Sequence, residues 1–322
     1  MKDSLRSPVI TLVVVSLLYL GFVVWADRQQ AMSQGLGLVL SYAPYLLLAT
    51  MASYSFRFFR WWWLLRRVGY GVPLIMGAIS YLAGFAYTAT PGKVGELIRI
   101  RYFAKLNVPA ECTFGTFVFE RSCDLISVLL LSLFIVSGSG LLLIAVGFVG
   151  VVVGTVLLCA LKPGMLKWLE GLAKRIRLPV LPRLLAFLQV GVDHCRSWLN
   201  WTDMSIGVLL GIAAWAIVGL SFVYLLSGFT NIVPLPDAFS IYPLSMLVGA
   251  ASMIPGGVGS TEGAMVLLLG QYGVVLSTAV LLAVVIRIAT LWFGILLGFC
   301  AVGYLELYWR RSNRFSQSDS CQ

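Results

Sequence analysis

Two short tracts of the chain combine a proline and several glycines with a nearby glutamate. Pro91-Gly-Lys-Val-Gly-Glu96 recurs about 160 residues later as Pro255-Gly-Gly-Val-Gly259, and Glu262 follows closely. Both tracts interrupt long apolar segments, and proline and glycine do not continue a helix there. Unwound backbone at membrane depth persists only where it is buried in protein or lines a cavity. The repeat therefore predicts two broken membrane segments that together build one binding site.

The chemistry of these tracts favours an anionic ligand. Glycines leave backbone amides uncovered, and such amides form a nest that accepts a group such as phosphate. Arg121 and Arg287 each follow their tract by about 30 residues, which adds matching cations. We predict an anionic lipid headgroup as the ligand. The predicted substrate-binding residues are Pro91, Gly92, Lys93, Gly95, Glu96, Arg99, Arg121, Pro255, Gly256, Gly257, Gly259, Glu262 and Arg287.

Two interpretations are open for Glu96 and Glu262, which lie near the starts of the returning helices. Free N–H groups and the helix dipole favour a carboxylate there, so both residues could simply cap helices. A carboxylate at membrane depth is costly, however, and also suits the binding of a cationic group or of a proton.

Glu120, Arg121 and Asp124 form a second group of charges inside an apolar segment. Glu120 and Asp124 share a helical face at a spacing of four, so they repel unless a cation or a proton lies between them. Arg287, Lys93 or a proton could serve. We predict either a structural charge network or a set for charge and proton coupling. That set would comprise Glu96, Glu120, Asp124 and Glu262.

Composition defines the setting in which these groups act. Hydrophobic residues make up 60% of the 322 residues, charged residues only 11%, and the mean hydropathy is +0.93. These values exclude a soluble globular domain and predict a polytopic helical membrane protein. The length suits a single membrane domain, residues 1–322, with roughly eight membrane-entering segments of about 20 residues each.

We predict an all-α protein with six full spans and two re-entrant helical hairpins. The expected spans lie at about 8–26, 37–56, 113–137, 141–161, 204–228 and 277–306, and the expected hairpins break at the two glycine tracts. Residues 37–137 and 204–306 then form inverted-topology repeats. Both termini are expected in the cytoplasm of a bacterial cell, because this arrangement places most of the 23 Lys and Arg on that side of its inner membrane.

Two basic regions support this orientation. Arginines at 57, 60, 66 and 67 surround Trp61, Trp62 and Trp63, a combination typical of a cytoplasmic interface. Residues 162–202 interleave seven Lys and Arg with apolar residues. This loop fits amphipathic helices on an anionic membrane face, and it equally fits a solvated connector.

Other chemistry has little support in the sequence. His194 is the single histidine and no CxxC pair occurs among the six cysteines, so we expect no metal site, no cofactor and no catalytic residues. The net charge of +10 could suggest nucleic acid, but basic cytoplasmic loops account for it.

The motifs quoted above resemble those of the lysylphosphatidylglycerol synthase transmembrane family, also called the flippase-like domain family. The resemblance rests on Pro91-Gly-Lys-Val-Gly-Glu-Leu-Ile-Arg99, Glu120-Arg-Ser-Cys-Asp124, Pro255-Gly-Gly-Val-Gly-Ser-Thr-Glu262 and Arg287, and it covers most of the chain. The resemblance implies that this chain corresponds to the membrane region that moves a modified lipid between leaflets. We expect a stand-alone member without the cytosolic aminoacyltransferase domain.

Two functions follow as hypotheses. The first is a lipid transporter or flippase that moves an anionic phospholipid or a lipid-linked sugar by alternating access, with the acyl chains left in the bilayer. The alternative is a non-transporting membrane subunit of a lipid-modifying or glycosyltransferase complex, to which the loop at 162–202 would dock a cytosolic enzyme. The lipid's identity, the direction of transport, the coupling ion and the oligomeric state are left open by the sequence.

Overall fold

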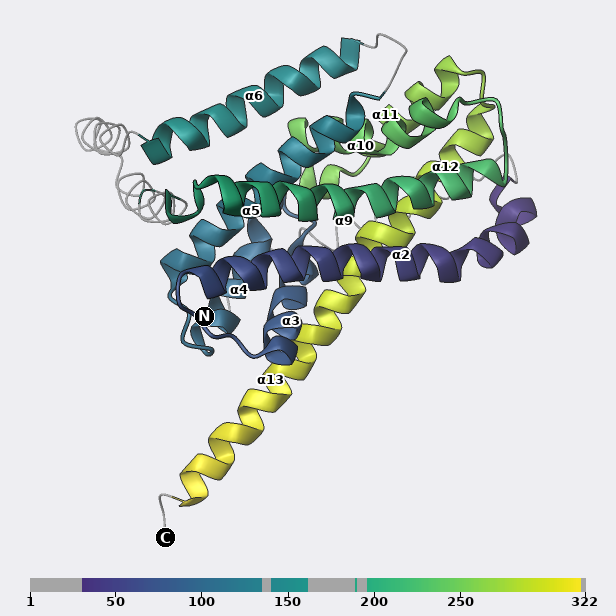
Figure 1. The fold of residues 1–322 in the computed structure, drawn as a ribbon. Coiled ribbons are helices and arrows are strands. Elements are labelled where there is room, and N and C mark those ends of the chain that lie inside the picture. The colour runs from purple at the N-terminus through teal and green to yellow at the C-terminus, as the bar shows by residue number, and fades with distance from the viewer. Residues whose placement is uncertain (1–30, 135–139, 162–188, 190–195, 320–322) are drawn as a thin grey trace, which may run out of the picture.

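The fold is a bundle of helices, several of them interrupted (Figure 1). The computed structural model describes residues 31–134, 140–161, 189 and 196–319, and within them there is no β-strand. The predicted first span at 8–26, the turn at 137–139 and most of the basic loop at 162–202 lie outside the described residues. The helical class predicted from composition is confirmed over the described part of the chain.

The elements follow one another in two halves. The first half contains α2 (Ala31–Arg67), α3 (Leu74–Ala83), η2 (Gly84–Tyr87), η3 (Pro91–Ile98), α4 (Arg99–Ala104), α5 (Ala110–Ser132) and α6 (Gly140–Leu161). The second contains η4 (Arg196–Trp198), α9 (Trp201–Ser227), α10 (Leu235–Ala251), η5 (Pro255–Gly257), α11 (Ser260–Gln271), α12 (Leu276–Arg287), η6 (Ile288–Trp292) and α13 (Phe293–Asp319). The long helices α2 and α9 pack against each other, and α9 also packs against α5.

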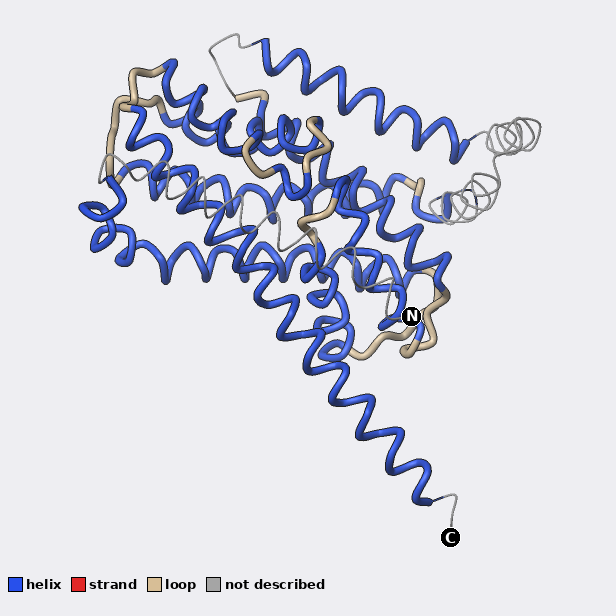
Figure 2. The backbone as a smooth tube through the Cα atoms, turned by 180° about the vertical axis from the view of Figure 1, so that it is seen from behind, coloured by secondary structure: helices blue, strands red, loops and turns tan. Residues whose placement is uncertain are grey.

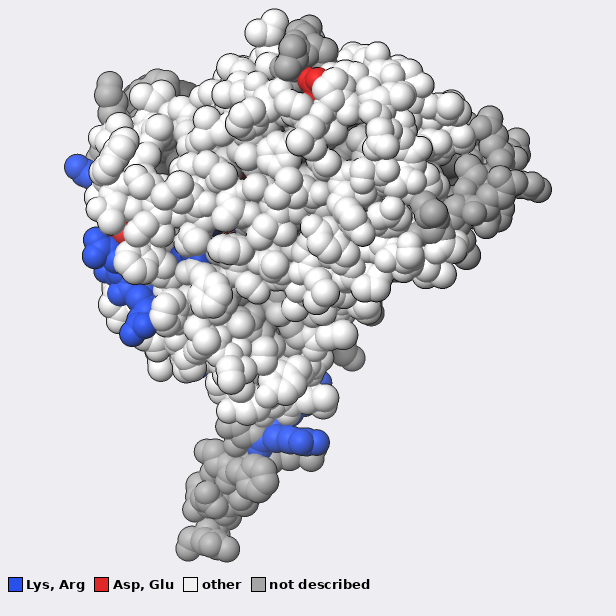
Figure 3. Space-filling model, turned by 45° about the vertical axis from the view of Figure 1, so that its right-hand side comes forward, with Lys and Arg blue, Asp and Glu red and all other residues white. Residues whose placement is uncertain are grey.

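Within the described part of the chain, three helical segments are long and apolar enough to cross a membrane: Gly140–Cys159, Trp201–Ser227 and Leu276–Arg311. Two further helices, α2 with 37 residues and α5 with 23, carry charged residues that pair inside the protein. On the face drawn in Figure 3, a broad area has no Lys or Arg, and these residues gather at the left edge and near the end of α13. These features fit a membrane protein, whereas the count of six spans stays a prediction.

Both glycine tracts break the helical path, as predicted. Gly92 and Lys93 have φ values of 60° and 57°, and Gly256 and Gly257 have φ values of 65° and 64°. This left-handed conformation cannot propagate a right-handed helix. The chain therefore unwinds between α3 and α4, and again between α10 and α11. That each break turns the chain back to the same membrane face stays a prediction.

The two breaks meet inside the bundle. Elements η3 and η5 contact each other, and the α-carbon of Ala89 would lie 3.5 Å from a β-carbon added to Gly256. Seen from behind, loop segments run through the interior of the bundle as well as around its ends (Figure 2). Residues about 160 positions apart in the sequence therefore lie side by side in the fold.

The path through α12 and α13 contains one turn of π-helix, η6, immediately after Arg287. Its wider turn leaves backbone carbonyls available to other groups. The Thr50 and Tyr54 hydroxyls of α2 donate hydrogen bonds to the carbonyls of Ala289 and Thr290, at 3.0 and 2.7 Å. The π-helical turn is thus fixed to α2 close to the two breaks.

Candidate functional site

The carboxylates of α5 form the centre of a buried ionic network. Glu120 and Asp124 are 0% and 5% exposed and share one helical face, as their spacing predicted. The Arg60 guanidinium lies between them, with Nη2 at 2.6 Å from Asp124 Oδ1 and 3.3 Å from Glu120 Oε1. Arg121 reaches back to the same pair, with Nη2 at 3.2 Å from Glu120 Oε1 and 3.1 Å from Asp124 Oδ2.

The cations of this network differ from those that the sequence suggested. Arg57 and Arg60, expected in the basic and aromatic cluster of a cytoplasmic interface, are 6% and 0% exposed and thus lie inside the protein. They lie two to three turns before the end of α2 and face α5, where they neutralise its carboxylates. Of the cations suggested for that role, Arg287 pairs with Glu262, and Lys93 forms no ion pair with the α5 carboxylates among the described residues. The spacing of three between Arg57 and Arg60, which gives them a common helical face, was the signal available in the sequence.

Glu96, in the first broken segment, is joined to the α5 network by Arg99. Glu96 Oε1 accepts a hydrogen bond from the Thr88 hydroxyl at 2.9 Å, and its Oε2 lies 3.1 Å from Arg99 Nη2. Arg99 Nη1 lies 3.3 Å from Glu120 Oε2, and its guanidinium stands 4.0 Å above the ring of Tyr81. Tyr81 in turn donates a hydrogen bond to Glu120 at 2.5 Å.

Glu262 has a different arrangement in the second broken segment. Its Oε2 accepts a hydrogen bond from the Gly259 N–H at 2.7 Å, which caps the start of α11. Its Oε1 accepts one from Arg287 Nε at 2.9 Å, and Arg287 also donates to the carbonyl of Gly256. Glu262 therefore caps a helix and, through Arg287, holds the broken segment in place.

Each glycine tract has two consecutive left-handed residues, but the ion pairs around the two tracts differ. Arg287 pairs with the glutamate of its own broken segment, whereas Arg121 pairs with carboxylates of its own helix. The partner of Glu96 is Arg99, three residues further along the chain. The similar sequence spacing of Arg121 and Arg287 from their tracts thus does not give them equivalent contacts.

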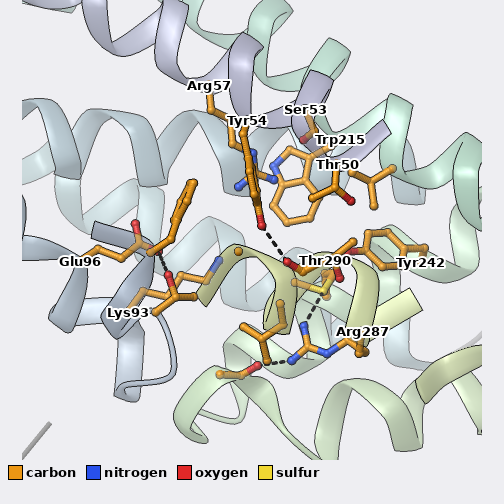
Figure 4. Close-up of a pocket in the computed structure, with 17 residues that line it drawn as sticks. Thr50, Ser53, Tyr54, Arg57, Lys93, Glu96, Trp215, Tyr242, Arg287 and Thr290 are labelled. Atoms are coloured by element: carbon orange, nitrogen blue, oxygen red, sulfur yellow. Dashed lines mark hydrogen bonds between the residues drawn. The ribbon is translucent and has the colours of Figure 1, made fainter. Parts of the chain in front are cut away.

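Lys93 occupies the position that corresponds to Gly257 of the second tract. Its ammonium has no hydrogen bond or ion pair with any described residue, although it lies deep between the two halves. Figure 4 shows its side chain directed toward the middle of a cavity.

That cavity has a volume of about 60 Å³ and is bounded by α2, η2, η3, α9, α10, η5, α12, η6 and α13. The labelled side chains in Figure 4 are Thr50, Ser53, Tyr54, Arg57, Lys93, Glu96, Trp215, Tyr242, Arg287 and Thr290. Arg57 stacks on Trp215 at 4.2 Å from the ring centre. Ser53 Oγ and Arg57 Nε are buried and have no hydrogen-bond partner within the described part of the chain. Buried polar atoms of this kind are normally paired, so these atoms are available to a ligand or to water.

A second cavity of about 240 Å³ adjoins the first, and the two share Lys93, Trp215, Met246 and Gly256 as lining residues. Eight of the predicted site residues line one or both cavities: Gly92, Lys93, Glu96, Arg121, Asp124, Gly256, Gly257 and Arg287. Six others do not reach a cavity wall: Gly95, Arg99, Glu120, Pro255, Gly259 and Glu262. Of these, Arg99, Glu120 and Glu262 contact residues that line a cavity.

Electrostatics distinguishes this region from an ordinary helix interface. Six cations lie around the two cavities, and four carboxylates balance four of these charges. The cations are Arg57, Arg60, Lys93, Arg99, Arg121 and Arg287, and the carboxylates are Glu96, Glu120, Asp124 and Glu262. Among the described residues, the cluster therefore carries two surplus positive charges. A buried surplus of charge is costly unless water or an anion balances it.

The fold and the buried ionic site define an all-helical membrane protein. Residues 9–298 match the family described as Lysylphosphatidylglycerol synthase TM region, and the chain belongs to this family. A UPF0104 membrane protein of Methanothermobacter thermautotrophicus is 29% identical over 116 residues, which are 36% of this chain and 35% of that protein. The match thus spans about a third of the relative. No solved structure matches the chain.

Proposed function

We propose that the protein moves a lipid with an anionic headgroup between the two leaflets by alternating access. The observation that carries this proposal is the surplus of two positive charges around cavities at the junction of the two broken segments. A site near the meeting point of two repeats is what an alternating-access transporter requires. Membership of the family supports the same conclusion.

In this proposal the headgroup phosphate binds to groups that the protein leaves without partners. Lys93 supplies an ammonium, and Ser53 and Arg57 supply buried donors that face the same cavity. Charge-assisted hydrogen bonds from such donors are stronger than neutral ones, and the surrounding apolar medium strengthens them further. Arg121 approaches from the second cavity, where it is 17% exposed while it holds two carboxylates.

The remaining charged residues would hold other side chains in place and would not contact the headgroup. Arg99 and Arg60 form ion pairs with carboxylates and line neither cavity, so they fix the orientation of Glu96, Glu120 and Asp124. Exchange of a proton on one of these carboxylates during transport is part of the proposal. The location in a bacterial inner membrane, with both termini in the cytoplasm, is also part of it.

Reconstitution tests the function directly. Purified protein in liposomes that contain fluorescent phosphatidylglycerol should make inner-leaflet label accessible to an external quencher, while phosphatidylcholine should move at the protein-free rate. The Arg57→Ala variant should lose the movement of phosphatidylglycerol with its fold intact. Equal movement of the two lipids, or none with folded wild-type protein, would contradict the proposal. Co-purification of a transferase together with no movement would favour the subunit hypothesis.

A further inference from the structure

The cavity of about 240 Å³ is amphipathic along its length. One end carries Lys93, Arg121 and Asp124 beside the glycines of both breaks. Thr90 and Thr261 add two hydroxyls, and the rest of the wall is apolar. It is formed by Leu125 and Val128 of α5, Phe148 and Val152 of α6, and Leu247 and Ala250 of α10. The charged end is shared with the first cavity, so the apolar part is a continuation of the proposed headgroup site.

Helix α6 closes this cavity on the outside. It is the outermost helix on its side of the bundle in Figure 1 and contacts only the neighbouring helices α5 and α10 extensively. Ala145 and Val149 anchor it in the core at 2% and 3% exposure, whereas Val151 on the opposite face is 69% exposed. Phe148 and Val152 stand beside the anchoring residues and face the cavity. The apolar space is therefore one helix away from the exterior.

The size and the polarity of this space indicate a hydrocarbon ligand. An apolar cavity of roughly 150 Å³ binds benzene rather than water, so apolar walls of this extent favour a hydrocarbon ligand. Empty space of this size in a protein core is unfavourable because the lining atoms lack contact partners. A flexible alkyl chain supplies those contacts along the whole cavity.

We propose that this cavity binds one hydrocarbon chain of the lipid whose anionic headgroup occupies the site at Lys93. The proposal rests on the proposed function and adds a chain-binding part to it. It departs from the expectation that all acyl chains stay in the bilayer. One molecule fits both parts, because the cavities share Lys93 as a lining residue and the second cavity continues from it along an apolar wall.

Two tryptophan variants on neighbouring positions of α6 test the proposal. Val152→Trp fills the cavity, whereas Val151→Trp adds the same side chain on the exposed face. Binding of dioctanoyl phosphatidylglycerol and of glycerol 1-phosphate is measured for the purified protein in detergent. Val152→Trp should weaken binding of the lipid about tenfold, as expected when about two methylenes lose their buried site, and should leave glycerol 1-phosphate unaffected. Val151→Trp should bind both probes as the wild type does.

A second variant tests the same cavity in case Val152→Trp does not fold. Ala250 lines the same cavity but is exposed, so Ala250→Leu narrows the space without disturbing the packed core. Ala250→Leu should weaken binding of dioctanoyl phosphatidylglycerol and leave binding of glycerol 1-phosphate unchanged. Wild-type affinity for the lipid in both Val152→Trp and Ala250→Leu would overturn the chain site.

The headgroup site is judged separately with Arg57→Ala. If this variant weakens lipid binding while the two cavity variants do not, the proposed function stands and the chain site is wrong. If Arg57→Ala binds both probes as the wild type does, the proposed headgroup site is wrong. Failure of folded wild-type protein to bind dioctanoyl phosphatidylglycerol would overturn both proposals.

Discussion

Lys93 and Gly257 hold the same position in the two glycine tracts and adopt almost the same left-handed backbone, with φ values of 57° and 64°. Glycine adopts this conformation without steric cost, whereas a residue with a β-carbon loses roughly 1–2 kcal/mol there. The Lys93 ammonium also lacks an ionic partner among the described residues. The first glycine tract thus has a strained cation without an ion pair at the position where the second tract has glycine.

Replacement of Lys93 by glycine should separate stability from binding. Lys93→Gly removes the strain, and part of that gain is offset because glycine is more flexible in the unfolded chain, so the free energy of unfolding should rise by about 1 kcal/mol. Retention of phosphatidylglycerol should fall at the same time. Thermal unfolding without lipid and native mass spectrometry of co-purified lipid measure the two effects.

Asn107 offers a matched control for that variant. It is also left-handed, with φ of 60°, but lies in the connection between α4 and α5, away from both cavities. Asn107→Gly should leave lipid retention unchanged, and its stability gain should be smaller because asparagine tolerates this conformation better than lysine does. Lys93→Gly protein that retains lipid like the wild type would rule out a binding role for Lys93.

Arg60 and Arg57 should differ in their contributions to stability. Arg60 is fully buried and contacts both α5 carboxylates, so Arg60→Ala leaves unpaired buried charge and should destabilise the protein by about 3–5 kcal/mol. Arg57 is 3.9 Å from Asp124 and stacks on Trp215, so Arg57→Ala should cost about 2 kcal/mol or less. Thermal unfolding in detergent ranks the two variants, and the reverse order would contradict the assignment of Arg60 as the main counterion.

The pair of Glu262 and Arg287 should be sensitive to removal of one partner and tolerant of removal of both. Arg287→Ala leaves the Glu262 carboxylate buried at 1% exposure and should cost about 3–5 kcal/mol. The double variant Glu262→Gln/Arg287→Met should recover much of this loss, because the amide oxygen of the glutamine can still accept from the Gly259 N–H while no charge is left unpaired. A double variant as unstable as Arg287→Ala would show that the ion pair itself stabilises the second break.

Helix α13 contains two glycines that should respond in opposite directions to alanine. A β-carbon at Gly298 would collide with the backbone of Ala86 in η2, so Gly298→Ala should destabilise by about 1–3 kcal/mol. Gly303 has open space around it and lies in the same helix, so Gly303→Ala should stabilise by up to about 1 kcal/mol through helix propensity. Unfolding temperatures of the two variants compare them directly. Similar shifts would mean that α13 does not pack closely on the first broken segment.

The sequence by itself determined the features that depend on neighbouring residues. Pro91 and Pro255, each followed by glycine, interrupt the helix through local backbone geometry. The proline ring removes an N–H donor, and glycine adopts left-handed backbone because it has no β-carbon. The shared face of Glu120 and Asp124 likewise follows from helical periodicity alone. High apolar content indicated a membrane protein independently of the order of its helices.

Only the tertiary structure decided which charges meet. Arg60 neutralises carboxylates that lie 60 and 64 positions further along the chain, because α2 passes α5 at that point, and periodicity within one helix does not encode such crossings. For the same reason Arg121 and Arg287 follow their tracts at similar distances in the sequence but have different partners. Lys93 likewise forms no ion pair with a described residue where the two breaks meet. The cavities also arise only from this packing, since their walls combine helices from both halves of the chain.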